Sequence, residues 1–357
     1  MAAKRVAIVM AGGSGERFWP LSQPDRPKQL LKLAHPGMTL LEEAAARVAP
    51  LVGAENVFVA TTRALAEPIA TSGTIPAANV IAEPTRRNTL GCLIWASATL
   101  AARFDSEDLS LAVVTADHSI GDEEAFRATV GEAMGLAEET GALVTIGIRP
   151  TRAETGYGYL EIGEPMSPGR AARQARAFRE KPSPADAARY VAGGRHLWNS
   201  GMFFWTLASF QRELSAAQPE SFAVLGAIRG ALTRGDENGA ERLFGQLPTI
   251  SVDKGLMELA RHVAVVPAEF VWDDVGAWDA LQRCLPTDAE GNVVQGAVVQ
   301  IDAKGCVLIN EGLGAPVGVV GIENLVVVAS RHGVLVCPKD QAQRVREIVA
   351  RLERERA

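Results

Sequence analysis

The sequence predicts an α/β protein with a Rossmann-like, mostly parallel sheet and a small C-terminal β domain. Up to about residue 267, short apolar runs alternate with alanine-rich stretches of helical length, which favours a sheet covered by helices on both faces. After about residue 286, short β-branched runs are interrupted by glycines. We therefore expect two domains, one over 1–285 and a smaller, β-rich one over 286–357 that ends in a helix.

The individual elements follow from these runs. Strands are expected over 6–10, 57–60, 111–115 and 143–148. Helices are expected over 39–48, 89–103, 123–139, 184–192 and 207–217. In the second part, strands are expected over 293–301, 305–309, 317–320 and 325–329. A charged amphipathic helix over 341–354 suits packing or solvent contact rather than chemistry.

The composition limits the classes of function. The chain of 357 residues is 47% hydrophobic and 22% charged, so it can bury a sizeable core. Its net charge of −6 argues against nucleic-acid and membrane partners, so any phosphate must be bound by locally placed cations. The four cysteines lack metal-site spacing, and no apolar run approaches the length of a membrane span. The expected compartment is the cytoplasm.

The most informative segment is the glycine-rich stretch 11–20, Ala-Gly-Gly-Ser-Gly-Glu-Arg-Phe-Trp-Pro, which follows the first predicted strand. Glycines let backbone N–H groups approach an anion, and Arg17 and Lys28 would add positive charge. The stretch lacks the third spaced glycine of a dinucleotide fingerprint and the Gly-Lys-Ser/Thr end of a P-loop. The glycines alone also fit an ordinary tight turn.

The full pattern, Gly-Gly-x-Gly-x-Arg-x-x-Pro with a later Pro-Lys, resembles the opening of the sugar-nucleotide pyrophosphorylases. The variant Arg-Phe-Trp-Pro-Leu-Ser, with Pro-Lys-Gln-Leu-Leu, is similar to that of the mannose-1-phosphate guanylyltransferases. The resemblance covers about residues 4–285. It implies the GT-A-like nucleotidyltransferase fold and, at the C-terminal end, a short left-handed β-helix of the kind used in subunit contacts, hence a homodimer.

The same resemblance implies an enzyme that transfers GMP from GTP to α-D-mannose 1-phosphate, giving GDP-mannose and diphosphate by direct in-line attack. Such a transfer needs orientation and charge compensation more than covalent help from the protein. Arg17 and Lys28 would stabilise the triphosphate as catalytic residues. The nucleotide would also contact the glycine-rich segment at Ala11, Gly12, Gly13 and Gly15.

Two carboxylates are candidates for a metal site. Asp117 directly follows the apolar run 111–115, and Asp274 lies in Trp-Asp-Asp-Val-Gly. Mg²⁺ takes one or two protein carboxylates and completes its shell with water and phosphate oxygens. By resemblance, Asp117 and Asp274 are catalytic and hold Mg²⁺, with Mn²⁺ as the second possible ion. Asp273 competes with Asp274, Asp117 alone also fits a helix cap, and His118 is the weaker ligand candidate.

Three pieces of the middle segment supply the groups that a hexose phosphate needs: hydroxyl-directed hydrogen bonds, a cation and an apolar wall. By resemblance, Gly158 presents its backbone to the sugar, Glu180 accepts from sugar hydroxyls, Lys181 neutralises the sugar phosphate and Asn199 contacts the sugar. Read singly, Glu180 and Lys181 are also a surface charge pair, and Asn199 is also a turn residue.

The segment expected to recognise the base is residues 83–89, Glu-Pro-Thr-Arg-Arg-Asn-Thr. Guanine presents two adjacent donors, N1–H and N2–H₂, which one carboxylate can accept, whereas adenine leaves one oxygen without a partner. Glu83 is therefore the hypothesis for base reading, although neighbouring backbone groups remain an alternative. Asn88 is also placed at the nucleotide, and Asn88 or Thr89 is expected to cap the next helix.

Three other functions stay open at this stage. A guanylyltransferase for another sugar 1-phosphate, such as glucose or heptose, would differ only in the recognition of hydroxyl positions. A catalytically silent subunit that senses nucleotide sugars would keep the fold, but this chain retains Arg17, Lys28 and both aspartates. A metal-dependent glycosyltransferase would leave the glycine-rich segment without a role.

Overall fold

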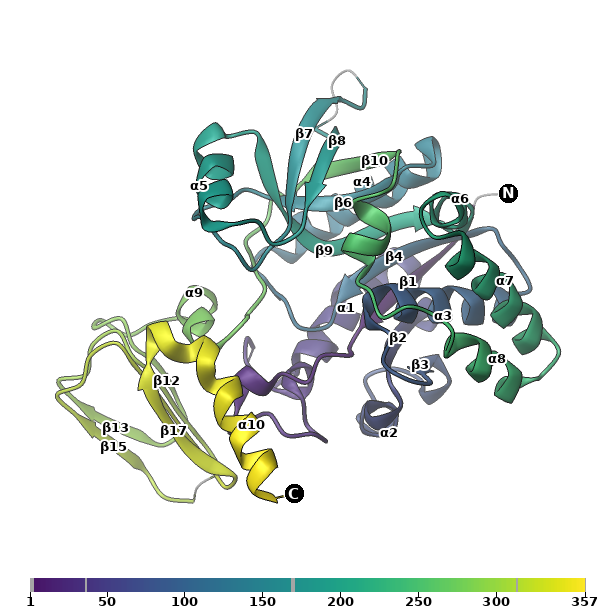
Figure 1. The fold of residues 1–357 in the computed structure, drawn as a ribbon. Coiled ribbons are helices and arrows are strands. Elements are labelled where there is room, and N and C mark those ends of the chain that lie inside the picture. Colours follow the sequence, from purple (N-terminus) through teal and green to yellow (C-terminus); the bar gives the residue numbers. More distant parts are fainter. Residues whose placement is uncertain (1–2, 36, 168–170, 313, 357) are drawn as a thin grey trace. The chain divides into compact units, whose positions relative to one another are not determined.

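The computed structural model describes residues 3–35, 37–167, 171–312 and 314–356. It forms two compact units (Figure 1). Unit 1 contains Met1–Gly12, Ala45–Thr115 and Asp122–Val271. Unit 2 contains Gly13–Ala44, Ala116–Gly121 and Trp272–Ala357. The chain therefore leaves unit 1 three times, first within the glycine-rich segment, and returns to it twice.

Unit 1 is built on a nine-stranded sheet in the order β3-β2-β1-β4-β9-β6-β10-β8-β7. Its strands are β1 Lys4–Met10, β2 Val57–Thr62, β3 Val80–Glu83, β4 Leu109–Thr115, β6 Leu143–Ile148, β7 Tyr159–Pro165, β8 Arg173–Arg179, β9 His196–Thr206 and β10 Val263–Pro267. The first four in spatial order run parallel, as do β6 and β10. Strand β9 lies antiparallel between β4 and β6, so the second half of the sheet is mixed.

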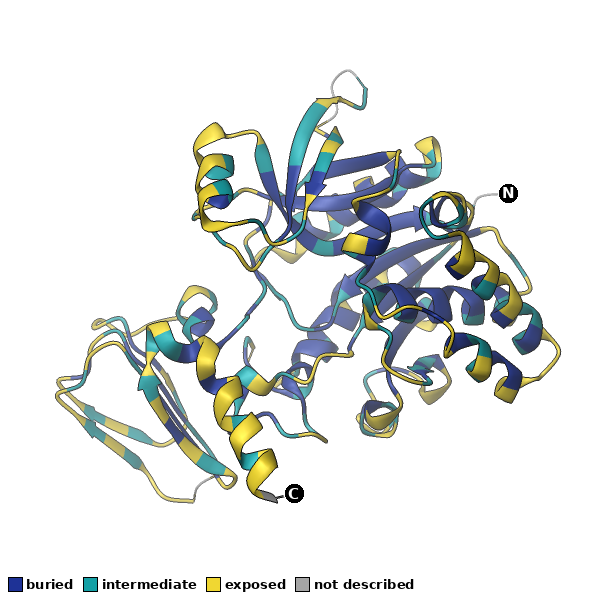
Figure 2. Ribbon diagram, in the orientation of Figure 1, coloured by how far each residue is buried: buried dark blue, intermediate teal, exposed yellow. Residues whose placement is uncertain are grey.

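Helices cover this sheet. They are α2 Arg63–Thr71, α3 Asn88–Phe104, α4 Glu123–Thr140, α5 Pro184–Gly193, α6 Leu207–Ala217, α7 Pro219–Thr233 and α8 Glu237–Phe244, with α1 Leu40–Val52 crossing between the units along the chain. Short turns are η3 Ala54–Asn56, η4 Ala77–Asn79 and the π-helical η5 Asp253–Met257. Figure 2 shows the central strands buried along most of their length, as expected for a sheet covered on both faces.

The carboxyl ends of β1 and β4 lie side by side in the sheet. Met10 pairs with Thr115 at the last position of both strands, so the chain leaves the sheet at neighbouring points before the glycine-rich segment and before Asp117. Parallel strands place such carboxyl ends on one edge of the sheet, where ligands bind. The predicted α/β fold is confirmed, including the strand that precedes the glycines.

Unit 2 contains the β-rich C-terminal part. Its strands are β5 Ser119–Ile120, β11 Trp272–Asp273, β12 Val293–Gln295, β13 Val298–Ile301, β14 Val307–Glu311, β15 Val317–Val320, β16 Leu325–Ser330 and β17 Gly333–Pro338. Its helical pieces are η1 Glu16–Phe18, η2 Lys28–Leu30, η6 Trp278–Ala280, α9 Leu281–Cys284, η7 Lys339–Arg344 and α10 Val345–Arg356.

The strands of this part form short parallel stacks. Strands β12, β14 and β16 pair in parallel, and so do β13 and β15, while β17 closes the larger stack antiparallel to β16. The predicted strand over 293–301 is broken at Gly296, which has φ 81° and whose missing Cβ leaves room for the Asn310 carbonyl oxygen. The predicted small β domain is confirmed, and among the described residues no helix is both long and apolar enough to cross a membrane.

Candidate active site

A pocket of about 370 Å³ opens in unit 2. Its walls come from the glycine-rich segment, from the loop after β4, from the segment after β11 and from the C-terminal helix. The lining residues are Gly13, Ser14, Gly15, Glu16, Arg17, Phe18, Lys28, Asp117, His118, Asp274, Gly276 and Arg346. The four charged residues predicted to be catalytic, Arg17, Lys28, Asp117 and Asp274, are all among them. Segments spread over more than three hundred positions of the chain therefore meet here.

The glycine-rich segment owes its path to one position above all. Gly15 has φ 65°, and a Cβ built there would lie 2.5 Å from the Lys28 Cβ and 2.6 Å from the Lys28 nitrogen. Only glycine fits this close approach, which brings the chain before Arg17 against the start of η2. Gly12 and Gly13 have nothing within 4 Å of a built Cβ, so no neighbouring atom requires glycine there. Open space of this kind leaves backbone N–H groups accessible to a ligand.

Two of the predicted nucleotide contacts, Ala11 and Gly12, lie in unit 1. Ala11 is buried, its N–H donates to the Ala60 carbonyl over 2.8 Å, and its carbonyl accepts from Thr61 Oγ1 over 2.8 Å. These bonds tie the start of the segment to β2. The backbone groups of Ala11 are therefore engaged within the sheet, whereas Gly13 and Gly15 line the unit 2 pocket.

Lys28 is the central cation of the pocket. It is 6% exposed, and its Nζ donates to Asp117 Oδ2 over 2.9 Å and to the Asp274 carbonyl oxygen over 2.7 Å. The Phe18 ring centroid lies 5.6 Å from the same nitrogen. Burial alone would raise the pKa of Asp117, but the charge of Lys28 and its hydrogen bond oppose this and help to hold that pKa below its ordinary value. Asp117 is therefore ionised at neutral pH.

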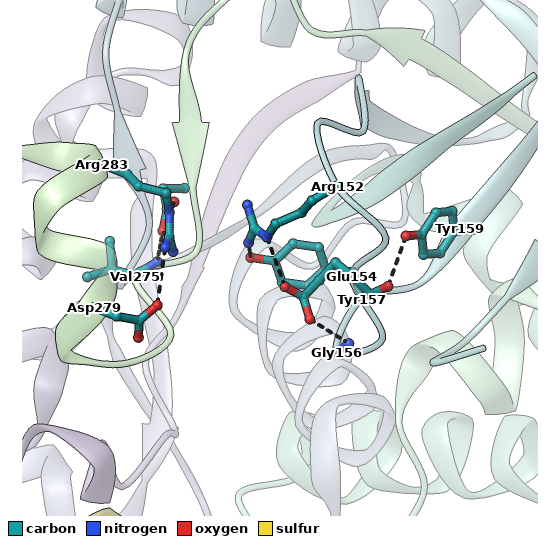
Figure 3. Close-up of polar contacts among 9 residues, drawn as sticks. Arg152, Glu154, Gly156, Tyr157, Tyr159, Val275, Asp279 and Arg283 are labelled. Carbon is teal, nitrogen blue, oxygen red and sulfur yellow. Dashed lines mark hydrogen bonds and ion pairs between the residues drawn. The ribbon is translucent and has the colours of Figure 1, made fainter. Parts of the chain in front are cut away.

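The neighbours Asp273 and Asp274 have different environments. Asp273 is buried, and its carboxylate accepts from Arg283 Nε over 2.5 Å and from the Val275 N–H over 2.8 Å, next to the Arg283–Asp279 contact drawn in Figure 3. Val275 has φ 46°, a conformation that β-branched residues rarely adopt, and the Asp273 bond fixes it. Asp274 instead lines the pocket. Asp273 thus holds the turn that presents Asp274.

Arg17 and Glu16 lie on the pocket wall with opposite charges. The Arg17 Nε is buried and makes no hydrogen bond within the described parts of the chain, which leaves a donor ready for a ligand. Glu16 is exposed, as a solvent-facing side chain is expected to be, and its carboxylate accepts from Ser14 Oγ over 2.9 Å. Among the described residues, the Glu16 carboxylate therefore bonds to the Ser14 hydroxyl and not to Arg17.

His118 is held by its neighbour Trp272. The Trp272 Nε1–H donates to His118 Nδ1 over 3.1 Å, and the rings meet edge to face at 5.2 Å. Since Nδ1 accepts this bond, the geometry assigns the proton of the neutral ring to Nε2. His118 lines the pocket as a hydrogen-bond donor in this tautomer, a role that suits a phosphate oxygen better than a metal ion.

Unit 1 brings together the four residues predicted to contact the sugar phosphate. The Asn199 N–H donates to the Gly158 carbonyl over 2.8 Å, and a Cβ on Gly158 would lie 2.8 Å from Glu180 Oε2. Glu180 Oε1 lies 3.0 Å from Lys181 Nζ, and the Lys181 side chain is 63% exposed. Lys181 also has φ 49°, so the backbone bends sharply after Glu180. The cluster therefore has a buried amide, a carboxylate and an exposed cation.

The loop before Gly158 is shaped by its own side chains (Figure 3). Arg152 Nε lies 3.1 Å from Glu154 Oε2, and Arg152 Nη2 donates to the Tyr157 hydroxyl over 3.3 Å. Glu154 Oε1 accepts from the Gly156 N–H over 3.0 Å, and the Tyr159 hydroxyl donates to the Glu154 carbonyl over 2.9 Å. This network fixes the turn that delivers the Gly158 backbone.

Asp253, in η5, belongs to the same cluster but was not predicted. Asn199 Nδ2 donates to Asp253 Oδ1 over 3.0 Å, while Asn199 Oδ1 accepts from Thr145 Oγ1 over 2.9 Å. The two bonds set the orientation of the Asn199 carboxamide. Burial, assisted by the charge of Glu180, raises the pKa of Asp253 to about 6. No sequence motif marks this residue, because the single aspartate sits in an irregular turn.

The proposed base reader, Glu83, ends β3 in unit 1 and is 7% exposed. Its Oε2 makes no hydrogen bond within the described residues. Burial raises the pKa of Glu83 to about 7, although the Arg87 backbone N–H and the charge of Arg86 oppose the shift. A buried carboxyl with an oxygen to spare is a group that a ligand can satisfy.

The helix cap after Glu83 was predicted one or two residues too late. Helix α3 begins at Asn88, so its N-cap is Arg87, which makes no side-chain cap bond. Asn88 has φ 61°, and its Oδ1 accepts from the Thr89 N–H over 2.8 Å. The Thr89 hydroxyl accepts from the Val252 N–H over 2.8 Å. The Asn88 carboxamide thus bonds to the adjacent residue, and the Thr89 hydroxyl is used by a long-range partner instead of a local cap.

The donor chemistry of the unit 2 pocket fits a hard divalent cation. Asp117 and Asp274 offer carboxylate oxygens at one pocket, and the described residues contain no group of three or more His, Cys, Asp or Glu side chains arranged to hold a metal. Two carboxylates suffice where phosphate oxygens and water complete the shell. The donor set thus favours an ion that shares its coordination with a phosphorylated substrate.

Comparisons with known proteins agree with this architecture. A family model described as nucleotidyl transferase matches residues 6–291, and one described as a MannoseP isomerase/GMP-like beta-helix domain matches residues 296–352. The chain is 36% identical to the Xanthan biosynthesis protein XanB of Xanthomonas campestris pv. campestris (strain B100), over 97% of this chain and 73% of the relative. It is 36% identical to a mannose-1-phosphate guanylyltransferase of Sinorhizobium fredii, over 99% of this chain and 68% of the relative.

A solved structure from Thermus thermophilus, described as a mannose-1-phosphate geranyltransferase, superposes with a TM-score of 0.87 at 39% identity, covering 98% of this chain and 99% of that chain. The family resemblance seen in the motifs is confirmed by these matches. The chain belongs to the nucleotidyl transferase family and is an enzyme related to the mannose-1-phosphate guanylyltransferases.

Proposed function

We propose that this protein transfers GMP from GTP to α-D-mannose 1-phosphate, giving GDP-mannose and diphosphate. The observation that carries the proposal is the unit 2 pocket, where Arg17, Lys28, Asp117 and Asp274 surround one space beside a glycine-rich segment. Relatives named mannose-1-phosphate guanylyltransferase match nearly the whole chain, and their name suggests the two substrates. Charge compensation is the main demand of phosphoryl-group transfer, and this pocket is built from charges.

In the proposed reaction, a phosphate oxygen of mannose 1-phosphate attacks the α-phosphorus of GTP. A new P–O bond forms, and the bond from the α-phosphorus to the bridging oxygen of the diphosphate breaks in line with it. Arg17 contributes its unpartnered Nε–H, and Lys28 contributes its ammonium group, to the oxygens that gain negative charge. Because Lys28 is already held by Asp117 and the Asp274 carbonyl, its position costs little reorganisation during the reaction.

Nucleotidyltransferases of this kind use a divalent metal, and we propose that Asp117 and Asp274 hold it here as Mg²⁺, with Mn²⁺ able to replace it. When bound, the ion supplies Lewis-acid neutralisation of phosphate oxygens. Asp117 is suited to this because its pKa lies below the ordinary value. Asp273 supports it indirectly by fixing the turn at Val275.

In unit 1, the proposed roles divide between sugar and base. Asn199 and Glu180 recognise the sugar hydroxyls, Gly158 gives backbone groups, and Lys181 neutralises the sugar phosphate. Glu83 reads the guanine edge, supported by its buried, unsatisfied Oε2. Asn88 contacts the nucleotide from the start of α3. We further propose that the enzyme is a homodimer that works in the cytoplasm.

The decisive experiment crosses four nucleoside triphosphates with mannose, glucose and heptose 1-phosphates and measures diphosphate release by the purified protein. We expect kcat/KM to be highest for GTP with mannose 1-phosphate, by about 100-fold over ATP, because a site that pairs polar groups strongly rejects a ligand lacking its partners. Preference for another sugar would make the protein a different guanylyltransferase. Absence of diphosphate release with every pair would refute the proposal.

A further inference from the structure

The C-terminal helix contributes an arginine to the unit 2 pocket. Helix α10 packs against η1, beside the purple N-terminal segment in Figure 1. Val345 and Ala342 are buried in the same apolar cluster as Phe18 and Trp278. Arg346, directly after Val345, lines the pocket together with Arg17. Apolar packing of one residue thus fixes the starting point of the next side chain.

The charges of the pocket make this arginine significant. Without it, the lining side chains carry two positive charges, Arg17 and Lys28, against three negative ones, Glu16, Asp117 and Asp274. Before a metal ion binds, that set has a net charge of −1, and Arg346 brings the sum to zero. Arg346 is therefore the third of three cations in the lining of a pocket suited to an anion of high charge.

Arg346 is also available for a ligand. It is exposed and forms no hydrogen bond or ion pair with any other described residue. The pKa of the neighbouring Glu347 is lowered mainly by a hydrogen bond from Arg344 and to a smaller extent by the charge of Arg346. Arg344 is paired with Glu347 over 3.0 Å, so the adjacent arginine is already used within the helix. A planar guanidinium with free N–H groups matches phosphate oxygens bidentately.

We propose that Arg346 is a phosphate-binding residue of this pocket, so that the β-helix-like domain supplies a side chain to the polyphosphate site of the nucleotidyl transferase domain. The identification of the ligand as the triphosphate of GTP, or as the diphosphate released from it, rests on the proposed function. Helix α10 thereby gains a role in binding that the charged, amphipathic sequence over 341–354 did not predict.

The test is titration calorimetry of inorganic diphosphate into the full chain at constant magnesium concentration. Arg346→Ala should weaken binding about 10-fold, and Arg346→Lys about 3-fold, because lysine keeps the charge and loses the bidentate geometry. The matched control is Arg351→Ala, since Arg351 is exposed on the same helix and also acts on Glu347 but does not line the pocket. Its affinity for diphosphate should match that of the wild type.

Equal diphosphate affinities for Arg346→Ala and Arg351→Ala would overturn the inference. If Arg346→Ala lost its melting transition, Arg346→Gln, which keeps most of the side-chain length, would replace it in the same comparison. In turnover, Arg346→Ala should raise KM for GTP about 10-fold and leave KM for mannose 1-phosphate unchanged, a split that general loosening of the helix would not give.

Failure of this inference is distinguishable from failure of the proposed function. Diphosphate binding requires no sugar substrate and no transfer. A wild-type protein that makes no GDP-mannose, but whose Arg346→Ala variant binds diphosphate less tightly, would refute the function and leave Arg346 as a phosphate ligand. A wild-type protein that makes GDP-mannose, with an Arg346→Ala variant that binds diphosphate as tightly as the wild type, would support the function and refute the role of Arg346.

Discussion

The two units hold their polar side chains in opposite ways. In unit 2, charged groups surround an open pocket, and the Asp117 side chain is 37% exposed although Lys28 binds it. In unit 1, the Asn199 amide is 9% exposed and is held on both sides by Thr145 and Asp253. The contrast separates two demands of the reaction. Groups that compensate charge must be reachable by phosphate, whereas groups that distinguish hydroxyl positions must be oriented before the sugar arrives.

The largest expected effect comes from removing the central cation of unit 2. Lys28→Met keeps the apolar stem but leaves Asp117 and the Asp274 carbonyl without their donor. We expect kcat to fall about 10³-fold, the scale seen when a preorganised donor to a developing charge is lost. The measurement is steady-state diphosphate release with saturating substrates. Lys32→Met, at an exposed position nearby, is the control, and turnover near the wild-type rate in Lys28→Met would end the assignment.

The neighbouring aspartates allow a sharper comparison within unit 2. Asp274→Asn should lower turnover about 100-fold, because Asp274 lines the pocket and is proposed to hold the metal ion there. Asp273→Asn should instead lower the free energy of unfolding by about 2 kcal/mol, since Arg283 and the Val275 N–H lose an ionised acceptor. Urea denaturation and turnover of both variants measure the split. The same loss of stability in both would contradict distinct roles.

In unit 1, disturbing the orientation of Asn199 should affect one substrate only. Asp253→Asn lets two carboxamides face each other, so the Asn199 amide can turn over, and Thr145→Val removes the donor on its other side. Each change should raise KM for mannose 1-phosphate about 10-fold and leave KM for GTP unchanged. The two constants are measured by varying one substrate at a time. An equal rise in both constants would show that unit 1 merely lost stability.

The smallest expected effect is a change in the pH dependence of stability at Glu83. Its pKa in the folded protein is about 7, against 4.5 for the exposed group, so the folded state keeps a proton that the unfolded state has lost between these values. Stability therefore falls as pH rises from about 4.5 to 7, and Glu83→Gln removes that fall. Relative to the wild type, the variant should gain about 1 to 2 kcal/mol between pH 5 and pH 8.

Urea denaturation of both proteins at the two pH values measures this gain, with Glu67→Gln as a control at an exposed carboxylate. If the free energy of unfolding depended on pH in the same way for the wild type and Glu83→Gln, Glu83 would not have a raised pKa in the folded protein. The same variant tests base reading, since an unchanged preference for GTP over ATP would remove Glu83 from that role.

The sequence predicted the parts of the molecule that depend on neighbours along the chain. The strand before the glycines and the cations at 17 and 28 sit in one short motif, and short β-branched runs interrupted by glycines mark the β-rich end. It did not predict β9, because His196–Thr206 contains Asn-Ser-Gly in its middle, a typical turn sequence. In the structure, Gly201 takes φ 72° within this long central strand, and tertiary packing overrides the local preference.

The residues that the sequence did not identify have contacts set by tertiary structure. Asp253 reaches Asn199 across 54 positions from a π-helical turn that no local pattern encodes. Arg346 resembles every other arginine of a charged helix until the packing of Val345 directs that helix against η1. Asp273 and Asp274 are adjacent and chemically equal in sequence, and the structure distinguishes them by the Arg283 partner of Asp273 and by the place of Asp274 in the pocket lining.

The most direct test of the central claim is a crystal structure of the protein with magnesium and a non-hydrolysable GTP analogue. We expect the phosphates in the unit 2 pocket, within hydrogen-bond distance of the Gly13–Gly15 backbone and the Arg17 and Lys28 side chains, with the ion between phosphate oxygens and the carboxylates of Asp117 and Asp274. Phosphates bound elsewhere, with this pocket filled only by water, would contradict the account.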